Sequence, residues 1–138
     1  MTALAMDVPA LEAFLAREFP QVASDLRIEE VGPMTARMRL LRHERHLRPG
    51  GTISGPSMTL LADCAFYVAL LAQIGEQALA VTTNLSLDFL RKPADADLLC
   101  DCRILKLGRR LATGHAFLFG EGEADRPVAH ATLTYALP

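Results

Sequence analysis

Residues 56–74 read PSMTLLADCAFYVALLAQI, and this stretch decides the fold. It has no internal glycine or proline, and apolar residues occupy almost every position around a helical circumference. A helix that is apolar all round is buried in a core rather than laid on a surface. Its one charged residue, Asp63, and its lack of flanking basic anchors argue against a membrane span. We therefore expect Pro56 to about Ile74 to form a long central helix.

Strand-like patterns lie on both sides of this helix. Apolar and polar residues alternate from about residue 25 to residue 40, with a turn signal at Gly32-Pro33. Four more strand-like runs follow the helix, at about residues 79–90, 98–107, 111–119 and 128–137. Earlier, apolar residues at spacings of three and four predict a short helix over Val8–Phe19, which Pro20 ends. The order predicts an α+β fold in which an antiparallel sheet of five or six strands wraps around the central helix.

The composition is that of one globular domain covering residues 1–138. Hydrophobic residues make up 51% and charged residues 22%, and the net charge of −2 gives no electrostatic case for nucleic acid or an anionic membrane. The three cysteines lack a disulfide framework, and together with the four histidines they form no zinc pattern. With no signal-peptide pattern at the start of the chain, we expect a cytoplasmic protein without a metal.

Asp63 is the first candidate for chemistry. An unpaired buried carboxylate costs several kcal/mol, so its presence in an apolar helix needs a reason. One interpretation is a structural carboxylate satisfied by hydroxyls such as that of Thr59. The other is a general base or nucleophile that faces a substrate cleft.

The start of the same helix is the second candidate. Ser54 suits the N-cap and Pro56 the first helical position. The free N–H of Gly55, at the positive end of the helix, could polarise a carbonyl group. Simple capping explains the same residues.

A family resemblance rests on these residues. His46-Leu-Arg48-Pro-Gly-Gly51-Thr-Ile-Ser54-Gly55-Pro56, followed by Leu61-Ala-Asp63-Cys-Ala65, resembles the loop and helix of hotdog-fold acyl-CoA thioesterases, in particular the phenylacetate-pathway (PaaI-like) branch. The stretch from Ala80 to Pro93 is similar to the next strand of that family. The likeness runs from about Glu29 to the end of the chain.

The resemblance implies roles for particular residues. Asp63 corresponds to the acidic base or nucleophile and Gly55 to the residue whose N–H polarises the thioester carbonyl, and the two meet across a dimer interface. No cofactor is implied beyond coenzyme A as part of the substrate. The implied residues fall into three groups: catalytic Asp63, Gly55 and Ser54; acyl-binding Arg48, Met58, Phe66, Tyr67, Thr82, Thr83 and Asn84; and coenzyme A-binding Arg91, Lys92, Arg109 and Arg110.

The motif also departs from the family pattern. Arg48 stands in place of the usual Asn, Ser54 in place of His, and Pro56 in place of the second Gly. Arg48 could neutralise Asp63 of the partner subunit or bind a carboxylated acyl chain. Ser54 could hold the water or only cap the helix. The four basic residues have a plain alternative as solvated strand ends.

Three functions follow from these observations. The first is an acyl-CoA thioesterase for short, medium or aromatic acyl groups. The second is a non-catalytic binder of acyl-CoA or a small aromatic ligand, and the third is a purely structural oligomer. Because one helix against about six strands leaves sheet edges exposed, we expect a homodimer joined through strand edges, or a tetramer of two dimers.

Overall fold

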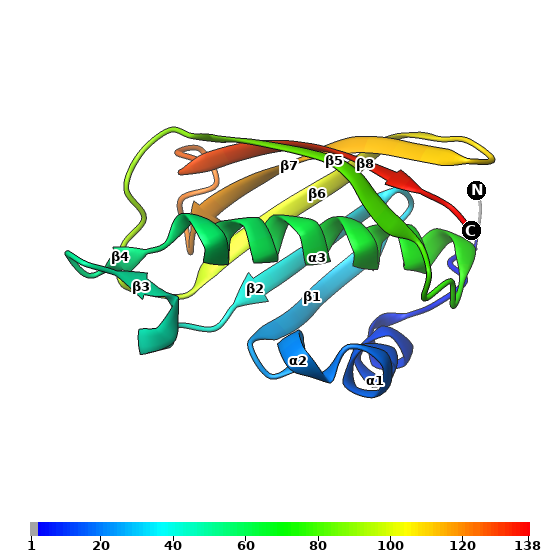
Figure 1. The fold of residues 1–138 in the computed structure, drawn as a ribbon, viewed down its shortest axis with the longest axis horizontal. Coiled ribbons are helices and arrows are strands. Elements are labelled where there is room, and N and C mark those ends of the chain that lie inside the picture. The colour runs from blue at the N-terminus through cyan, green and yellow to red at the C-terminus, as the bar shows by residue number, and fades with distance from the viewer. Residues whose placement is uncertain (1–2) are drawn as a thin grey trace.

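The structure is a computed structural model that describes residues 3–138. Its elements are α1 (Val8–Glu18), α2 (Pro20–Ala23), β1 (Leu26–Gly32), β2 (Thr35–Leu40), the 3-10 helix η1 (Glu44–His46), β3 (Leu47–Arg48), β4 (Thr52–Ile53), α3 (Gly55–Ile74), β5 (Val81–Phe89), β6 (Leu98–Leu107), β7 (Leu111–Gly120) and β8 (Ala129–Ala136). The expected α+β fold is confirmed. A six-stranded antiparallel sheet in the order β1-β2-β6-β7-β8-β5 curls around α3, which is the hotdog arrangement (Figure 1).

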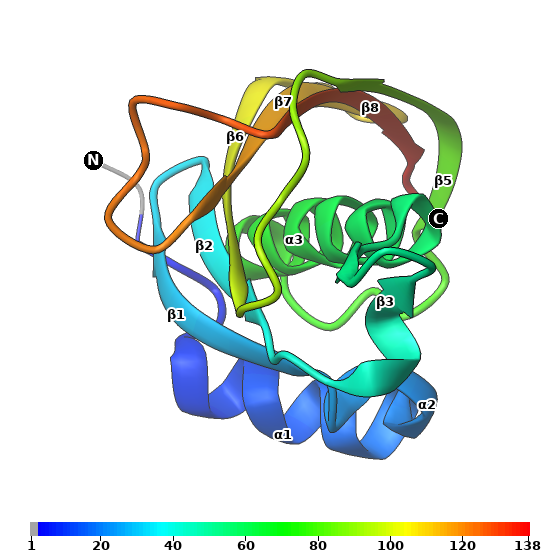
Figure 2. The same ribbon diagram turned by 90° about the vertical axis from the view of Figure 1, so that its left-hand side faces the viewer.

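The central helix lies where its composition requires. Its side chains are buried around most of its circumference, and Leu61, Phe66 and Leu70 are completely enclosed. In Figure 2 the sheet bends over one side of α3, while α1 and α2 lie below β1. By length and composition α3 could cross a membrane, but 72% of its most apolar window is buried inside the protein. It is therefore the core helix of the domain.

The strands show the period of two that the sequence predicts. In β2, Ala36, Met38 and Leu40 point inward and alternate with partly exposed residues. In β8, Leu133 and Tyr135 point inward in the same manner. Since successive strand residues face opposite sides, this alternation gives the sheet one face against α3 and one face toward water.

Three local details differ from the sequence prediction. Pro20 ends α1 but also begins the short helix α2, because proline suits a first helical position. The segment before α3, which the family resemblance makes a loop, holds η1 and a small β3–β4 hairpin, in which Gly50 and Gly51 take positive φ angles of 102° and 79°. Finally, α3 begins at Gly55 rather than Pro56, so the candidate N–H is that of the first helical residue.

The two edges of the sheet are not equivalent. At the β1 edge, the Glu12 side chain from α1 accepts a hydrogen bond from the Ile28 N–H at 2.7 Å, which occupies an edge donor. The β5 edge pairs only with β8, and large apolar side chains near its two ends are half exposed, Val81 at 55% and Phe89 at 55%. An unprotected, apolar strand edge is a template for pairing with another strand.

A close approach in the sheet gives a test of the packing. A Cβ added at Gly114 in β7 would lie 2.2 Å from the Arg103 carbonyl oxygen and 2.8 Å from the Phe66 ring. We therefore expect Gly114→Ala to lower the free energy of unfolding by about 3 kcal/mol, the upper part of the range for overpacking. Urea denaturation measures this loss. Gly120→Ala is the control, because its added Cβ would meet only the Glu123 side chain at 3.7 Å; equal stabilities would contradict the packing described.

Candidate active site

Asp63 is held by two strands as well as by its own helix. The Thr82 hydroxyl, at the start of β5, and the Tyr135 hydroxyl, near the end of β8, both donate to Asp63 Oδ1 at 2.6 Å. Tyr135 also contacts the Asp63 carbonyl oxygen at 3.0 Å. The half-buried carboxylate therefore has one oxygen fixed by two donors. No hydrogen bond among residues 3–138 uses its second oxygen.

The groups around Asp63 stay neutral at physiological pH. Burial raises the pKa of the Tyr135 hydroxyl far above its usual value, and the Asp63 charge raises it further. Burial also raises the pKa of the Cys64 thiol to about 12. Cys64 is therefore a thiol at pH 7 and not a thiolate nucleophile. Asp63 is the only carboxylate side chain of α3.

Asp63 opens onto a cavity of about 500 Å³. Tyr67, Thr82 and Tyr135 line it together with Asp63, as do Phe19 and Leu79, which the sequence did not suggest. Leu79 is 79% exposed on the connection before β5, and Phe19 ends α1. No local pattern marks either residue, because it is the docking of α1 beside this connection that brings them together.

Gly55 lies in a second cavity, of about 410 Å³. Arg48 and Met58 line it with Gly55, and the Phe89 ring at the end of β5 forms a wall. A Cβ at position 55 would lie 3.3 Å from that ring, so glycine keeps the approach to the helix end open. The Gly55 N–H has no intrahelical acceptor, and no hydrogen bond between main-chain groups of residues 3–138 uses it. It remains available to a ligand.

The two cavities are separate within one subunit. Gly55 and Asp63 are eight residues apart on α3, which is about 12 Å along the axis at the usual helical rise. Each cavity adjoins a different end of β5, Phe89 beside Gly55 and Thr82 beside Asp63. One chain therefore presents the two predicted catalytic groups at opposite ends of an exposed strand.

Ser54 is occupied as a cap. Its hydroxyl oxygen accepts from the Ser57 N–H at 3.3 Å, and its proton is directed to the Ser57 hydroxyl at 3.1 Å. The N-cap prediction for Ser54 is confirmed.

The predicted acyl-binding residues fall into four groups. Arg48 and Met58 reach the Gly55 cavity, and Tyr67 and Thr82 reach the Asp63 cavity. Thr83 and Asn84 are exposed at an irregular step of the β5–β8 register. The expectation for Phe66 is wrong: its ring is fully enclosed and stacks on Tyr135, with ring centroids 5.1 Å apart. A helix that is apolar all round offers no sequence signal to separate cavity-facing from core-facing side chains.

The predicted coenzyme A-binding residues divide between two ends of the sheet. Arg91 and Lys92 follow β5 and line a cavity of about 590 Å³ together with Arg126, which the sequence did not suggest. Arg109 and Arg110 lie in the β6–β7 turn at the opposite end, where the Leu137 N–H donates to the Arg110 carbonyl oxygen at 2.8 Å. In one subunit the four basic residues therefore cannot bind one phosphate group.

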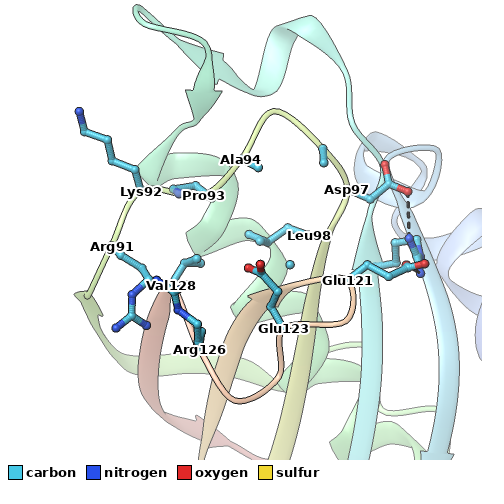
Figure 3. A pocket seen from close by; sticks show the side chains of 13 residues that line it. Arg91, Lys92, Pro93, Ala94, Asp97, Leu98, Glu121, Glu123, Arg126 and Val128 are labelled. Carbon is cyan, nitrogen blue, oxygen red and sulfur yellow. Dashed lines mark hydrogen bonds and ion pairs between the residues drawn. The ribbon is translucent and has the colours of Figure 1, made fainter.

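Figure 3 shows this cavity of about 590 Å³, which Arg91, Lys92 and Arg126 line. Arg91 and Arg126 reach toward the same corner of it, and Lys92 extends away. The Arg91 guanidinium donates to the Pro127 carbonyl oxygen at 2.5 Å, next to Arg126 in the chain. On the other side, Asp97 is neutralised by Arg39 of β2 at 3.1 Å. Among residues 3–138 no ion pair involves Arg91, Lys92, Arg126 or Glu123, so the cavity lining holds three unpaired cations and one unpaired carboxylate.

Comparison with known proteins identifies the family of the chain. The sequence profile of the thioesterase superfamily matches residues 50–126. A solved structure from Silicibacter sp., described as a candidate thioesterase, is 51% identical with a TM-score of 0.91, over 99% of this chain and 95% of that one. The protein thus belongs to the thioesterase superfamily.

Two more distant structures share the fold. A mutant of the phenylacetic acid degradation protein PaaI from Thermus thermophilus is 25% identical with a TM-score of 0.74, over 86% of this chain and 99% of that one. Zebrafish thioesterase superfamily member 2 is 20% identical with a TM-score of 0.83, over 96% and 99% of the two chains, and shows the fold alone. No curated protein matches the sequence at a significant level.

Substitutions at two tyrosines test whether Asp63 is ionised where it accepts the hydrogen bond from Tyr135. Tyr135→Phe removes a donor to a carboxylate, and hydrogen bonds to charged groups contribute about 1.5–3 kcal/mol. Tyr67→Phe removes a donor to the neutral Ala78 carbonyl oxygen, at 3.1 Å, and should cost about 0.5–1.5 kcal/mol. We expect Tyr135→Phe to be the more destabilising variant in urea denaturation at pH 7. A smaller loss for Tyr135→Phe than for Tyr67→Phe would contradict an ionised Asp63 at this contact.

Proposed function

We propose that this protein hydrolyses acyl-CoA thioesters with short, medium or aromatic acyl groups, as a homodimer or a tetramer of two dimers. Each site combines Gly55 of one subunit with Asp63 of the partner subunit. The observation that carries this proposal is the exposed edge strand β5, which has the Gly55 cavity at one end and the Asp63 cavity at the other.

Two-fold pairing of this edge would assemble the site. When two β5 strands pair antiparallel about a centre near Leu85 and Ser86, Thr82 of one subunit lies opposite Phe89 of the partner subunit. Since Thr82 contacts Asp63 and Phe89 walls the Gly55 cavity, the same pairing brings Asp63 of one subunit toward Gly55 of the other. The apolar side chains of Val81 and Phe89 would also lose their exposure. Their burial would stabilise the dimer.

The two groups supply what thioester hydrolysis needs. The Gly55 N–H, at the positive end of α3, would donate to the thioester oxygen and stabilise the negative charge that develops there. The free oxygen of Asp63 would take a proton from water, whose oxygen forms a bond to the carbonyl carbon as the C–S bond breaks and the proton passes to the leaving thiolate. Direct attack by Asp63, followed by hydrolysis of the anhydride, uses the same geometry. Thr82 and Tyr135 would hold the other carboxylate oxygen in place.

The basic residues suit the phosphates of coenzyme A. Arg91, Lys92 and Arg126 lie at the end of β5 nearest Gly55. The two-fold pairing that joins the β5 edges would bring Arg109 and Arg110 of the partner subunit to the same end of the combined sheet. Guanidinium groups bind phosphate oxygens through paired hydrogen bonds, which suits both a diphosphate and a 3′-phosphate. Arg48, at the Gly55 cavity, is placed to meet a carboxylated acyl chain or the carboxylate of Asp63 from the partner subunit.

A non-catalytic acyl-CoA binder is the second candidate. The observation that favours it is the engagement of Ser54, whose one hydroxyl proton is directed to Ser57 and so is not free to donate to a water or a thioester as the family's histidine would. Binding without release of free thiol would favour this function. The buried, free cysteines support a reducing location such as the cytoplasm for either function.

Substitution at Asp63 tests the catalytic role. General-base assistance contributes about 10²–10⁴-fold, so Asp63→Asn should lower kcat at least about 100-fold while the protein keeps its fold and mass. The measurement is release of coenzyme A thiol from a panel of short, medium and aromatic acyl-CoA substrates, with light scattering for mass. Asp101→Asn, which changes a carboxylate of β6 paired with Arg37 of β2 outside these cavities, is the matched control and should retain its kcat. Near-wild-type turnover by folded Asp63→Asn would rule out this mechanism.

Mixed dimers determine whether the site is shared between subunits. In a heterodimer of Asp63→Asn with Gly55→Pro, which lacks the backbone donor, one site carries both substitutions and the other carries neither. Activity should return to about half that of the wild-type dimer. If both groups act within one subunit, every site carries one substitution and no activity returns.

Charge reversal tests the phosphate site. Arg126→Glu, and the pair Arg109→Glu with Arg110→Glu, should each raise KM for acyl-CoA about tenfold at low salt with little change in kcat, because they act on a part of the substrate remote from the thioester. Steady-state kinetics over a salt series measures this. Arg27→Glu, on β1 at the far edge of the sheet, is the control and should leave KM unchanged. Equal KM values for all variants would mean that the phosphates bind elsewhere.

A further inference from the structure

A buried polar chain lies beneath the start of α3. Asp25, His46 and Ser57 are only 8%, 5% and 7% exposed and are the buried polar or charged residues of the described chain, 3–138. They come from three places: the residue before β1, the end of η1, and the first turn of α3. Buried polar groups are costly unless they bond to one another, so this grouping needs an explanation.

The hydrogen bonds run in one direction. The Ser54 hydroxyl donates to Ser57 Oγ at 3.1 Å, and Ser57 Oγ lies 2.7 Å from His46 Nδ1. With its oxygen already accepting from Ser54, the Ser57 hydroxyl directs its own proton to Nδ1. The His46 proton then sits on Nε2, which has no hydrogen-bond partner but faces Asp25 Oδ1 at 3.6 Å. This assignment of the tautomer follows from the network.

His46 is therefore an acceptor at Nδ1 when neutral. Burial lowers its pKa, and the positive charges of Arg45 and His43 act in the same direction. Arg45 in turn pairs with the Asp25 carboxylate. The imidazole stays neutral at pH 7 and keeps the chain directed from Ser54 through Ser57 to His46.

The same histidine holds the main chain next to Gly55. The Ser54 N–H donates to the His46 carbonyl oxygen at 2.8 Å. His46 thus binds the N-cap residue through its backbone and the third helical residue, Ser57, through its ring. Gly55 lies between these two fixed points.

We propose that His46, through Ser57, is a positioning residue that fixes the direction of the Gly55 N–H. This inference rests on the proposed role of that N–H in polarising the thioester carbonyl. None of the cavities described above is lined by His46, Ser57 or Asp25, so they do not touch substrate and are not catalytic residues. An oxyanion donor must lie within a few tenths of an ångström of its ideal position, so support from behind the helix end would act on kcat.

Paired variants at His46 and Ser57 test this role. Ser57→Ala and His46→Gln both remove the contact at Nδ1 and should lower kcat about tenfold with KM changed less than about twofold. His46→Asn carries an acceptor near the position of Nδ1 and should keep kcat within about threefold of wild type. Gln73→Ala is the control for helix stability, because it removes a 3.0 Å hydrogen bond to the Gly32 carbonyl oxygen at the other end of α3.

Two readouts separate this inference from the proposed function. Steady-state kinetics gives kcat and KM, and amide hydrogen exchange by NMR reports, without any substrate, on the Ser54 N–H, whose hydrogen bond to the His46 carbonyl oxygen holds the main chain next to Gly55. Faster exchange at Ser54 in Ser57→Ala and His46→Gln, but not in Gln73→Ala, is the expected result. If the wild type is inactive on all acyl-CoA substrates, the proposed function fails and exchange alone decides the positioning role. The positioning role is wrong if folded Ser57→Ala and His46→Gln both keep the kcat and the exchange rate of the wild type. It is also wrong if, across all four variants, the loss of kcat simply follows the loss of thermal stability.

Discussion

The fold depends on the burial of α3, a helix that is apolar on every side, by the sheet that surrounds it. No single sheet face can bury α3 completely, so the sheet bends around it, as Figure 2 shows. The carboxylate of Asp63 is the exception in that environment, and leaving it unpaired would cost several kcal/mol. Thr82 and Tyr135 supply the hydroxyls that it needs, from two neighbouring strands of the sheet. The packing that buries the helix is thus also what fixes one oxygen of the candidate base.

The second constraint is the difference between the two sheet edges. Glu12 occupies an edge donor of β1, whereas β5 offers its backbone and several apolar side chains to another strand. Each end of β5 adjoins one of the two candidate catalytic groups. The proposed dimer through this edge would account for both the exposed apolar surface and the separation of Gly55 from Asp63.

The start of α3 shows how the departures from the family motif can be accommodated. Ser54, where the family has histidine, is committed to the cap and to Ser57. Arg48, where the family has asparagine, lines the Gly55 cavity. Both changes leave the Gly55 N–H accessible, and the buried His46 supports the backbone beside it. The proposed polarisation of the carbonyl would use a backbone N–H, which does not depend on the side chain at that position.

The sequence by itself determined the features that local patterns carry. The apolar circumference predicted α3, the period of two predicted the strands, and the lone charge in an apolar helix singled out Asp63. Tertiary structure decided which side chains meet: Tyr135 with Asp63, Arg126 with Arg91, His46 with Ser57, and Phe66 with the core rather than a pocket. These meetings depend on strand register and on the rotation of α3 within the sheet. A shift of one residue reverses the face of every strand side chain, and a helix that is apolar all round carries no mark of its own orientation.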